Sequence, residues 1–315
     1  MTAREFKTKL TRLRQQSRQT GQVQLSASAL TLGAEAGIHL LFAAVLSGAT
    51  VFGASAPFGV ALVGAAGSGL CGAAALLGAC FGYLAMLDFS SGLRYASACV
   101  LTFAVAFAFY DLKPMRRPWA MPLVAGLFNG FTGFIVLSQA GWRTVDVIWF
   151  LLEVLLTVAA SWCYRLVLLP MRTSRTDRLL TPARRAGGLV LLCTAAMALS
   201  PLYLYKDISL GRILSVLLVL SAAWRGGVST GAVAGVAAGV SMDLAAAGTP
   251  LYTMAYGISG LTAGLRRGKG RPGCALVYAL TNAAAVLWTW DQGLRLSILY
   301  EVLFACLAFL LIPER

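Results

Sequence analysis

The chain has 315 residues, of which 58% are hydrophobic and only 12% are charged, and its mean hydropathy is +0.76. About a quarter of the residues of a soluble globular domain are charged, so this composition excludes an ordinary water-soluble fold. The formal net charge is +14, but the basic residues lie in short clusters between apolar runs. They form no single basic face with interleaved aromatic residues, which argues against nucleic acid as a partner and points to the lipid bilayer.

The first segment, residues 1–33, is polar and basic. It lacks the early apolar core of a cleaved signal peptide, so the first apolar segment is expected to direct insertion. Two interpretations stay open for this segment: an amphipathic helix on anionic headgroups, or a basic tail that only sets orientation. We predict a basic cytoplasmic leader at 1–33 and a multi-helix transmembrane domain at 34–315.

Apolar stretches then recur along the rest of the chain. Several are shorter than the roughly 20 residues that a 30 Å hydrocarbon core requires. The shortest are expected to be half-helices, buried spans or parts of a re-entrant pair, so we predict an all-α membrane bundle of 10–12 transmembrane segments. The twelve stretches lie at 34–53, 57–67, 70–87, 95–110, 119–138, 146–169, 186–204, 210–224, 227–244, 251–265, 273–290 and 294–312.

The basic residues predict the orientation of this bundle. If the N-terminus is inside and the twelve segments alternate, 21 of the 26 lysines and arginines fall on the inner side. This split is the positive-inside pattern of a membrane protein. We therefore predict a multi-pass protein of the bacterial inner membrane with both termini in the cytoplasm. The five remaining cations are Arg94, Arg143, Lys206, Arg212 and Arg295.

Two parts of the chain resemble each other. The motif Leu-Val-x-x-Leu-x-Asn ends at Asn129 and again at Asn282, and each copy follows a basic loop that ends in proline. Upstream, one glycine-rich stretch ends at Asp88 and another at Asp243. Because six segments separate the copies, we predict a parallel internal repeat of about 57–138 and 210–290, related by an axis along the membrane normal.

Ionisable residues inside apolar segments are few, and each is costly near the bilayer centre. Glu35 and His39 lie four residues apart on one helix face, while Glu153 and Glu301 lie at similar depths in the sixth and twelfth segments. These four residues form either a proton or cation path, or a set of helix-end groups that bond partner helices; we favour the second interpretation.

The remaining candidate polar residues are two asparagines and two aspartates. Asp88 and Asp243 are expected at outer helix ends, where water would solvate them. Asn129 and Asn282 are expected to hold helices together rather than to bind a ligand.

The sequence contains no motif for catalysis, cofactor binding or metal binding. The single histidine excludes multi-histidine metal sites, and the seven cysteines lie inside apolar runs without metal-ligand spacing. We therefore predict no enzyme activity for this chain and no cofactor. Small residues four apart, as at Gly64, Ser68 and Gly72 or at Gly231, Gly235 and Gly239, favour close helix packing, and self-association through such helices is expected.

Two stretches resemble a known family. Residues 47–61, with Ala-Pro-Phe-Gly at 56–59, are similar to the junction of the first two helices of stage II sporulation protein E. The final run from 299 to 315, with Leu-Tyr-Glu at its start and Ile-Pro-Glu-Arg at its end, is similar to the last membrane helix of that region. With the glycine-rich segments at 227–265, the resemblance covers nearly all of 34–315.

This resemblance implies the membrane anchor of a sporulation regulator at the asymmetric division septum. In that family a cytoplasmic region, which engages the tubulin-like division protein, follows the helices. A protein serine phosphatase, which needs a divalent metal such as manganese and acts on an anti-anti-sigma factor, comes next. The chain ends where that region would begin, so no catalytic residue is transferred to it. The alternative is a small secondary transporter or substrate-binding membrane component, which predicts a shared polar cavity among the buried charges.

Overall fold

The computed structural model describes residues 31–109, 111–173, 182–205, 208–246, 250–288 and 297–312. Nearly all of them are helical. The N-terminal half contains a first helix, Thr31–Leu46, followed by α2 Phe58–Ala66, α3 Leu70–Met86, α4 Phe89–Ala108, the short 3-10 helix η1 Lys113–Arg116, α5 Ala120–Ala140 and α6 Thr144–Thr173. The C-terminal half contains α7 Pro182–Ala198, strands β1 Tyr203–Tyr205 and β2 Ile208–Ser209, α8 Leu210–Ala246, α9 Leu251–Leu265, η2 Arg267–Lys269, α10 Gly270–Trp288 and α11 Ser297–Leu311.

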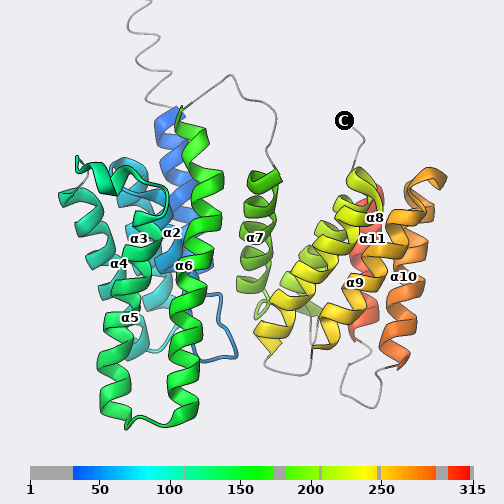
Figure 1. Cartoon of the computed structure of the whole chain (residues 1–315). Helices are drawn as coiled ribbons and strands as arrows, with labels where there is room; N and C mark the ends of the chain where they lie inside the picture. The colour runs from blue at the N-terminus through cyan, green and yellow to red at the C-terminus, as the bar shows by residue number, and fades with distance from the viewer. Residues whose placement is uncertain are drawn as a thin grey trace, which may run out of the picture.

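The two halves lie side by side, with α7 between them (Figure 1). The two antiparallel strands, β1 and β2, form a small hairpin and are the only named strands in the described part of the chain. Four helices within that part, α4, α5, α6 and α8, are long and apolar enough to cross a membrane. The prediction of an all-α membrane bundle is therefore confirmed. The leader at 1–30 lies outside the described residues.

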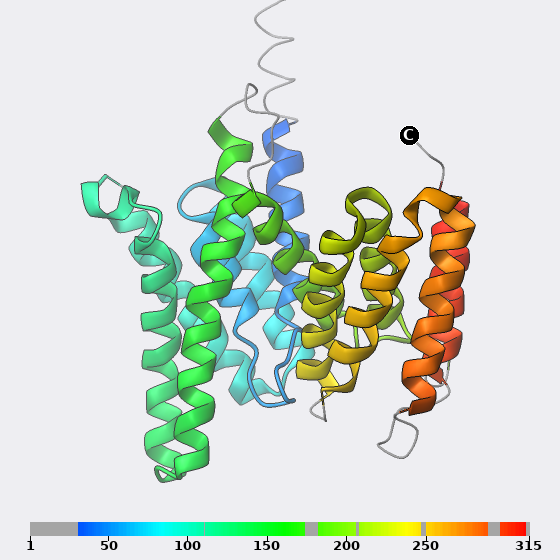
Figure 2. The same cartoon turned by 45° about the vertical axis from the view of Figure 1, so that its right-hand side comes forward.

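Helix α8 consists of two antiparallel arms, because the chain reverses at Gly227. This glycine has φ 78° and ψ −155°, which is not helical. Beyond it, the Thr230 hydroxyl donates to the carbonyl of Ala222 at 3.0 Å, so residues eight apart face each other. Figure 2 shows the two arms joined at one end. The apolar stretches predicted at 210–224 and 227–244 correspond to these arms.

Helix α2 is too short to cross a bilayer. Its nine residues span about 14 Å, against a hydrocarbon core of about 30 Å, and all nine are buried. The turn from α2 to α3 passes through Gly67, with φ 71° and ψ −148°, close to the conformation of Gly227. Stretch 57–67 is therefore a half-helix covered by protein on every side. The shared turn geometry accords with the predicted repeat, which stays a prediction.

Close helix packing rests on glycines that face backbone. A Cβ added at Gly78 or Gly82 of α3 would collide with the carbonyl oxygens of Leu40 and Ala44 in the first helix. Along the second arm of α8, Gly231, Gly235 and Gly239 face the backbone of α9 in the same way. Apolar burial gives little attraction between helices in lipid, so such close approach is a main source of stability.

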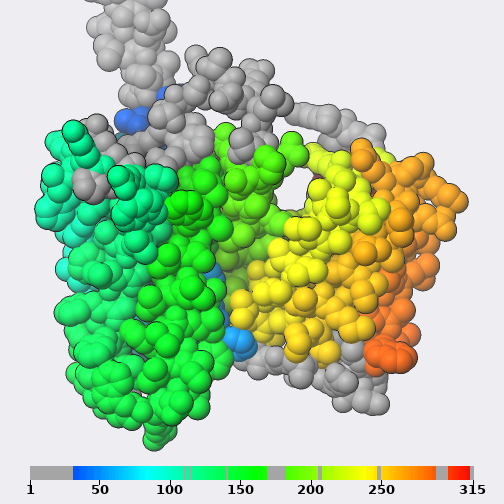
Figure 3. Space-filling model, in the orientation of Figure 1, coloured from blue at the N-terminus to red at the C-terminus, as the bar shows by residue number. Residues whose placement is uncertain are grey.

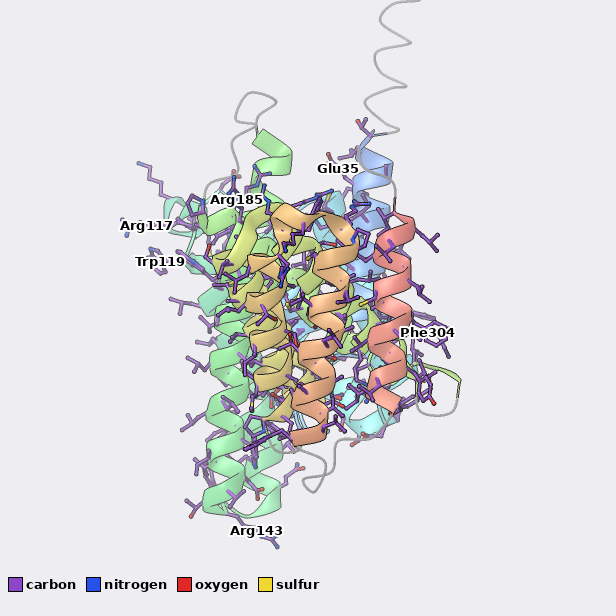
Figure 4. All side chains as sticks on the ribbon, turned by 90° about the vertical axis from the view of Figure 1, so that its right-hand side faces the viewer. Glu35, Arg117, Trp119, Arg143, Arg185 and Phe304 are labelled. Carbon is purple, nitrogen blue, oxygen red and sulfur yellow. The ribbon has the colours of Figure 1, made fainter. Side chains whose placement is uncertain are left out.

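Both ends of the described chain lie at the same end of the bundle (Figure 1). Arg117 and Arg185 lie at that end together with Glu35, whereas Arg143 lies at the opposite end (Figure 4). We call the first the basic end and the second the distal end. The α5–α6 hairpin extends beyond the other helices at the distal end (Figure 1).

Candidate functional site

A buried ion pair joins α4 to α6 in the N-terminal half. Nη2 of Arg94 donates to Oε1 of Glu153 at 2.7 Å, and the two side chains are 17% and 6% exposed. Asn129 on α5 donates to the same carboxylate oxygen at 3.0 Å and to the Thr157 hydroxyl at 2.9 Å. Thr157 donates onward to the carbonyl of Glu153 at 2.8 Å. These four residues, the α4–α6 cluster, tie three helices together.

Glycines on α5 make room for this cluster. A Cβ at Gly133 would lie 2.7 Å from Nη2 of Arg94, so a larger residue would displace the guanidinium. A Cβ at Gly126 or Gly130 would press against a valine of α6. The spacing of these glycines brings α5 close enough for Asn129 to reach α6, and the ion pair with its hydrogen bonds offsets the cost of burying two charges.

A second ion pair lies in the C-terminal half. Nε of Arg212, near the start of α8, lies 3.2 Å from Oε1 of Glu301 on α11, whose side chain is fully buried. The backbone N–H of Ser209 donates to the same oxygen at 2.7 Å. Nη1 of Arg212 donates to the Tyr252 hydroxyl at 2.9 Å. These four residues, the α8–α11 cluster, link α8, α9 and α11 to the strand hairpin.

Asp243 is not solvated, and the expectation that water surrounds it is wrong. It is only 7% exposed, because the start of α9 packs against it. Its two carboxylate oxygens accept from the backbone N–H groups of Tyr252 and Thr253, at 2.9 and 2.8 Å. The first N–H groups of a helix have no partner within the helix, so this carboxylate replaces water as their acceptor.

Asp88 lies at a helix end, as predicted. It is exposed, and it accepts from the backbone N–H of Ser91 at 3.1 Å, which caps α4. That hydrogen bond holds the pKa of Asp88 below its ordinary value. The carboxylate form therefore stabilises the start of α4.

Asn282 differs from Asn129, its counterpart in the predicted repeat. Neither of its amide atoms has a hydrogen-bond partner among the described residues. The buried hydroxyls of Tyr256, Tyr278 and Ser215 also have no hydrogen-bond partner among the described residues. Internal water commonly satisfies such groups, so the interior of the C-terminal half has the polarity to hold ordered water.

Glu35 and His39 lie apart from both clusters. Nδ1 of His39 is 2.7 Å from the backbone carbonyl oxygen of Glu35, and the ring is largely buried. The contact therefore involves the backbone of Glu35 rather than its carboxylate. Glu35 lies at the basic end of the bundle (Figure 4).

Neither of two pockets among the described residues joins the predicted intramembrane charges. The hydrogen bonds described for Glu153 stay within α4–α6, and those for Glu301 stay within the C-terminal half. A pocket of about 450 Å³ at the distal end is lined by Arg212 and Tyr252, but neither glutamate is among its lining residues. The transporter alternative required one polar cavity that joins these charges, and the described residues give it no support.

Sequence reasoning missed the two arginines that neutralise the buried glutamates. It counted Arg94 and Arg212 only among the five cations on the outer side. Arg94 is instead the sixth residue of α4, and Arg212 is the third residue of α8. A signal was available, because a glutamate inside an apolar helix requires a partner, and both arginines were among the five cations assigned to the outer side.

Comparison with known proteins adds to this geometry. The family model described as "SpoIIE, N-terminal domain" matches residues 1–315, the whole chain. The chain belongs to this family. No curated protein and no solved structure matches it. The resemblance to stage II sporulation protein E is thereby confirmed for the membrane region.

Proposed function

We propose that the chain is the membrane anchor and localisation domain of a sporulation-specific protein serine phosphatase at the asymmetric division septum. The observation that supports this most directly is the family match over residues 1–315. The helical bundle fits such a role, because the buried Glu153 and Glu301 are each paired with an arginine within the bundle and its long helices are apolar. We also propose that the polar residues inside the apolar helices have a structural role, which is the interpretation that the sequence favoured.

We further propose that the basic end faces the cytoplasm and that the chain crosses the inner membrane many times. Both ends of the described part of the chain lie there, with Arg117 and Arg185 (Figures 1 and 4), and cytoplasmic loops are enriched in lysine and arginine. Arg94 and Arg212 are held in ion pairs, which leaves only Arg143, Lys206 and Arg295 as candidate distal loop cations. Lysine and arginine residues are thus divided more unequally between the two ends of the bundle than the sequence count alone indicates.

In this proposal, partners engage a cytoplasmic region that continues from Arg315. By family resemblance these are the tubulin-like division protein and the anti-anti-sigma factor, and the phosphatase domain would need a divalent metal such as manganese. Self-association through the glycine-rich helices is also proposed, but the face with Gly231, Gly235 and Gly239 is covered by α9. Oligomer contacts would therefore use other helix faces.

The test is localisation of residues 1–315 with a fluorescent protein after Arg315, in a sporulating endospore-forming bacterium. A polytopic membrane protein of similar size, with the same fluorescent protein, is the matched control, because it measures the enrichment that the double membrane of a septum produces by itself. We expect stronger enrichment of the chain than of the control at the asymmetric septum. An identical distribution of the two fusions would contradict the localisation role.

A second fusion tests the orientation. Alkaline phosphatase is active only outside the cytoplasm, so a fusion after Arg315 is expected to be inactive, and a fusion within the α5–α6 turn at Arg143 is expected to be active. The reverse pattern would show that the basic end faces outward.

A further inference from the structure

A groove opens between α6, α7 and the first arm of α8 at the basic end. Its volume is about 630 Å³. Three arginines line it, Arg184, Arg185 and Arg225, together with aliphatic side chains that include Leu189, Leu192 and Leu218. Figure 3 shows an opening between the green and yellow helices near this end of the bundle. We call this feature the arginine groove.

The arginines and the leucines occupy different levels of the groove. Arg184 and Arg185 lie in the first turn of α7, and Arg225 lies in the last turn before the reversal of α8. Leu192 and Leu218 are each seven residues further toward the interior, which is about 10 Å along a helix. The groove is thus cationic at the membrane surface and aliphatic over about two-thirds of one leaflet's hydrocarbon depth.

The described residues do not balance the charge of the groove. Among them, no aspartate or glutamate lines the groove, and no ion pair involves these three arginines. A second copy of this chain is a poor source of counter-charge, because its net charge is +14 with only 12 acidic residues. An anionic group from the lipid leaflet fits both the charge and the depth of the groove.

We propose that the arginine groove binds one anionic phospholipid of the cytoplasmic leaflet. The three guanidinium groups hold its phosphodiester by charge-assisted hydrogen bonds, and one acyl chain lies along the leucines. Basic pockets between membrane helices on the cytoplasmic side suit anionic headgroups. The lipid would fill the space between the two halves of the bundle and link α7 to α8.

The first test measures binding of phosphatidylglycerol and phosphatidylcholine with the same acyl chains to the purified 315-residue chain in detergent, by native mass spectrometry. We expect wild type to prefer phosphatidylglycerol. The triple variant R184Q/R185Q/R225Q is expected to lose about tenfold or more of its affinity for phosphatidylglycerol. The matched control R266Q/R267Q/K269Q removes three charges from the same end, where Arg267 lies near Gly227, and is expected to keep the preference.

The second test addresses the acyl chain with all charges retained. Gly188 lines the groove, and a Cβ added there meets nothing within 4 Å, so Gly188→Leu fills space without a clash. Gly37→Leu in the first helix, where a Cβ also meets nothing, is the control. We expect G188L alone to weaken phosphatidylglycerol binding by about threefold or more, and soluble glycerol phosphate not to compete.

Three outcomes would overturn the proposal. Equal loss of binding in both triple variants would show a general effect of surface charge. Unchanged binding in R184Q/R185Q/R225Q would show that the lipid lies elsewhere. Competition by glycerol phosphate, with G188L binding like wild type, would show a site for a small anion instead of a phospholipid. Size-exclusion profiles that match wild type establish that each variant is folded.

Discussion

Breaking the Arg94–Glu153 ion pair is expected to destabilise the protein strongly, whereas removing both charges is not. Glu153→Leu leaves the guanidinium, 17% exposed, without its carboxylate inside the bundle. An uncompensated buried charge of this kind costs about 3–5 kcal/mol. In the double variant R94M/E153L no charge remains, and replacing a buried pair with apolar residues of similar volume is often neutral.

The remaining loss in the double variant comes from Asn129. Its amide donates to both Glu153 and Thr157, at 3.0 and 2.9 Å. After the substitution the second acceptor is still present, so we expect a residual loss of about 1 kcal/mol. The double variant should therefore be more stable than E153L by roughly 2–4 kcal/mol, given the cost of the unpaired charge.

Equilibrium unfolding in mixed micelles with increasing dodecyl sulfate, followed by tryptophan fluorescence, measures these differences. Arg143→Met is the matched control, because it also replaces an arginine by methionine, but at the distal turn between α5 and α6 (Figure 4). It should change stability by no more than about 0.5 kcal/mol. If R94M/E153L is no more stable than E153L, the ion pair is not what holds α4 to α6.

Three further predictions concern the C-terminal half and the start of α4. Glu301→Leu should also cost about 3–5 kcal/mol of stability. The double variant R212M/E301L should regain less stability than R94M/E153L, because the Ser209 N–H loses its acceptor and the Tyr252 hydroxyl loses its donor. The same unfolding assay compares the two double variants, and an equal gain in stability would contradict this. Gly235→Leu should cost at least about 1–3 kcal/mol, since its Cβ would collide with the Tyr256 carbonyl oxygen, whereas Gly37→Leu has open space and should be tolerated. The lowered pKa of Asp88 means that its carboxylate stabilises the folded state above the ordinary pKa of 3.8, and that this stabilisation is lost as the pH falls through the lower folded-state pKa. Thermal unfolding should therefore show wild type more stable than D88N at pH 7 and the difference shrinking toward pH 3, and a constant difference would refute the capping role.

The sequence by itself determined the class of the protein, its segments and its family. Apolar runs are local in the chain, and a helix in lipid satisfies its own backbone hydrogen bonds, so hydropathy was enough to place helices at all twelve stretches. The short stretch 57–67 was recognised as a half-helix candidate for the same reason, since length is also a local property. The motif at 56–59 and the final run identified the family without any contact between distant residues.

Only the tertiary structure decided which polar groups meet. Arg94 and Glu153 are 59 residues apart, and Ser209 and Glu301 are 92 apart, so no local pattern pairs them. Asp243 seemed solvated because it ends an apolar run, and its burial depends on where α9 begins to pack. The arginine groove likewise exists only because α7 and the first arm of α8 diverge at the basic end. Helices in lipid form locally, but burial and charge pairing depend on how they pack, and this is information that a linear pattern does not contain.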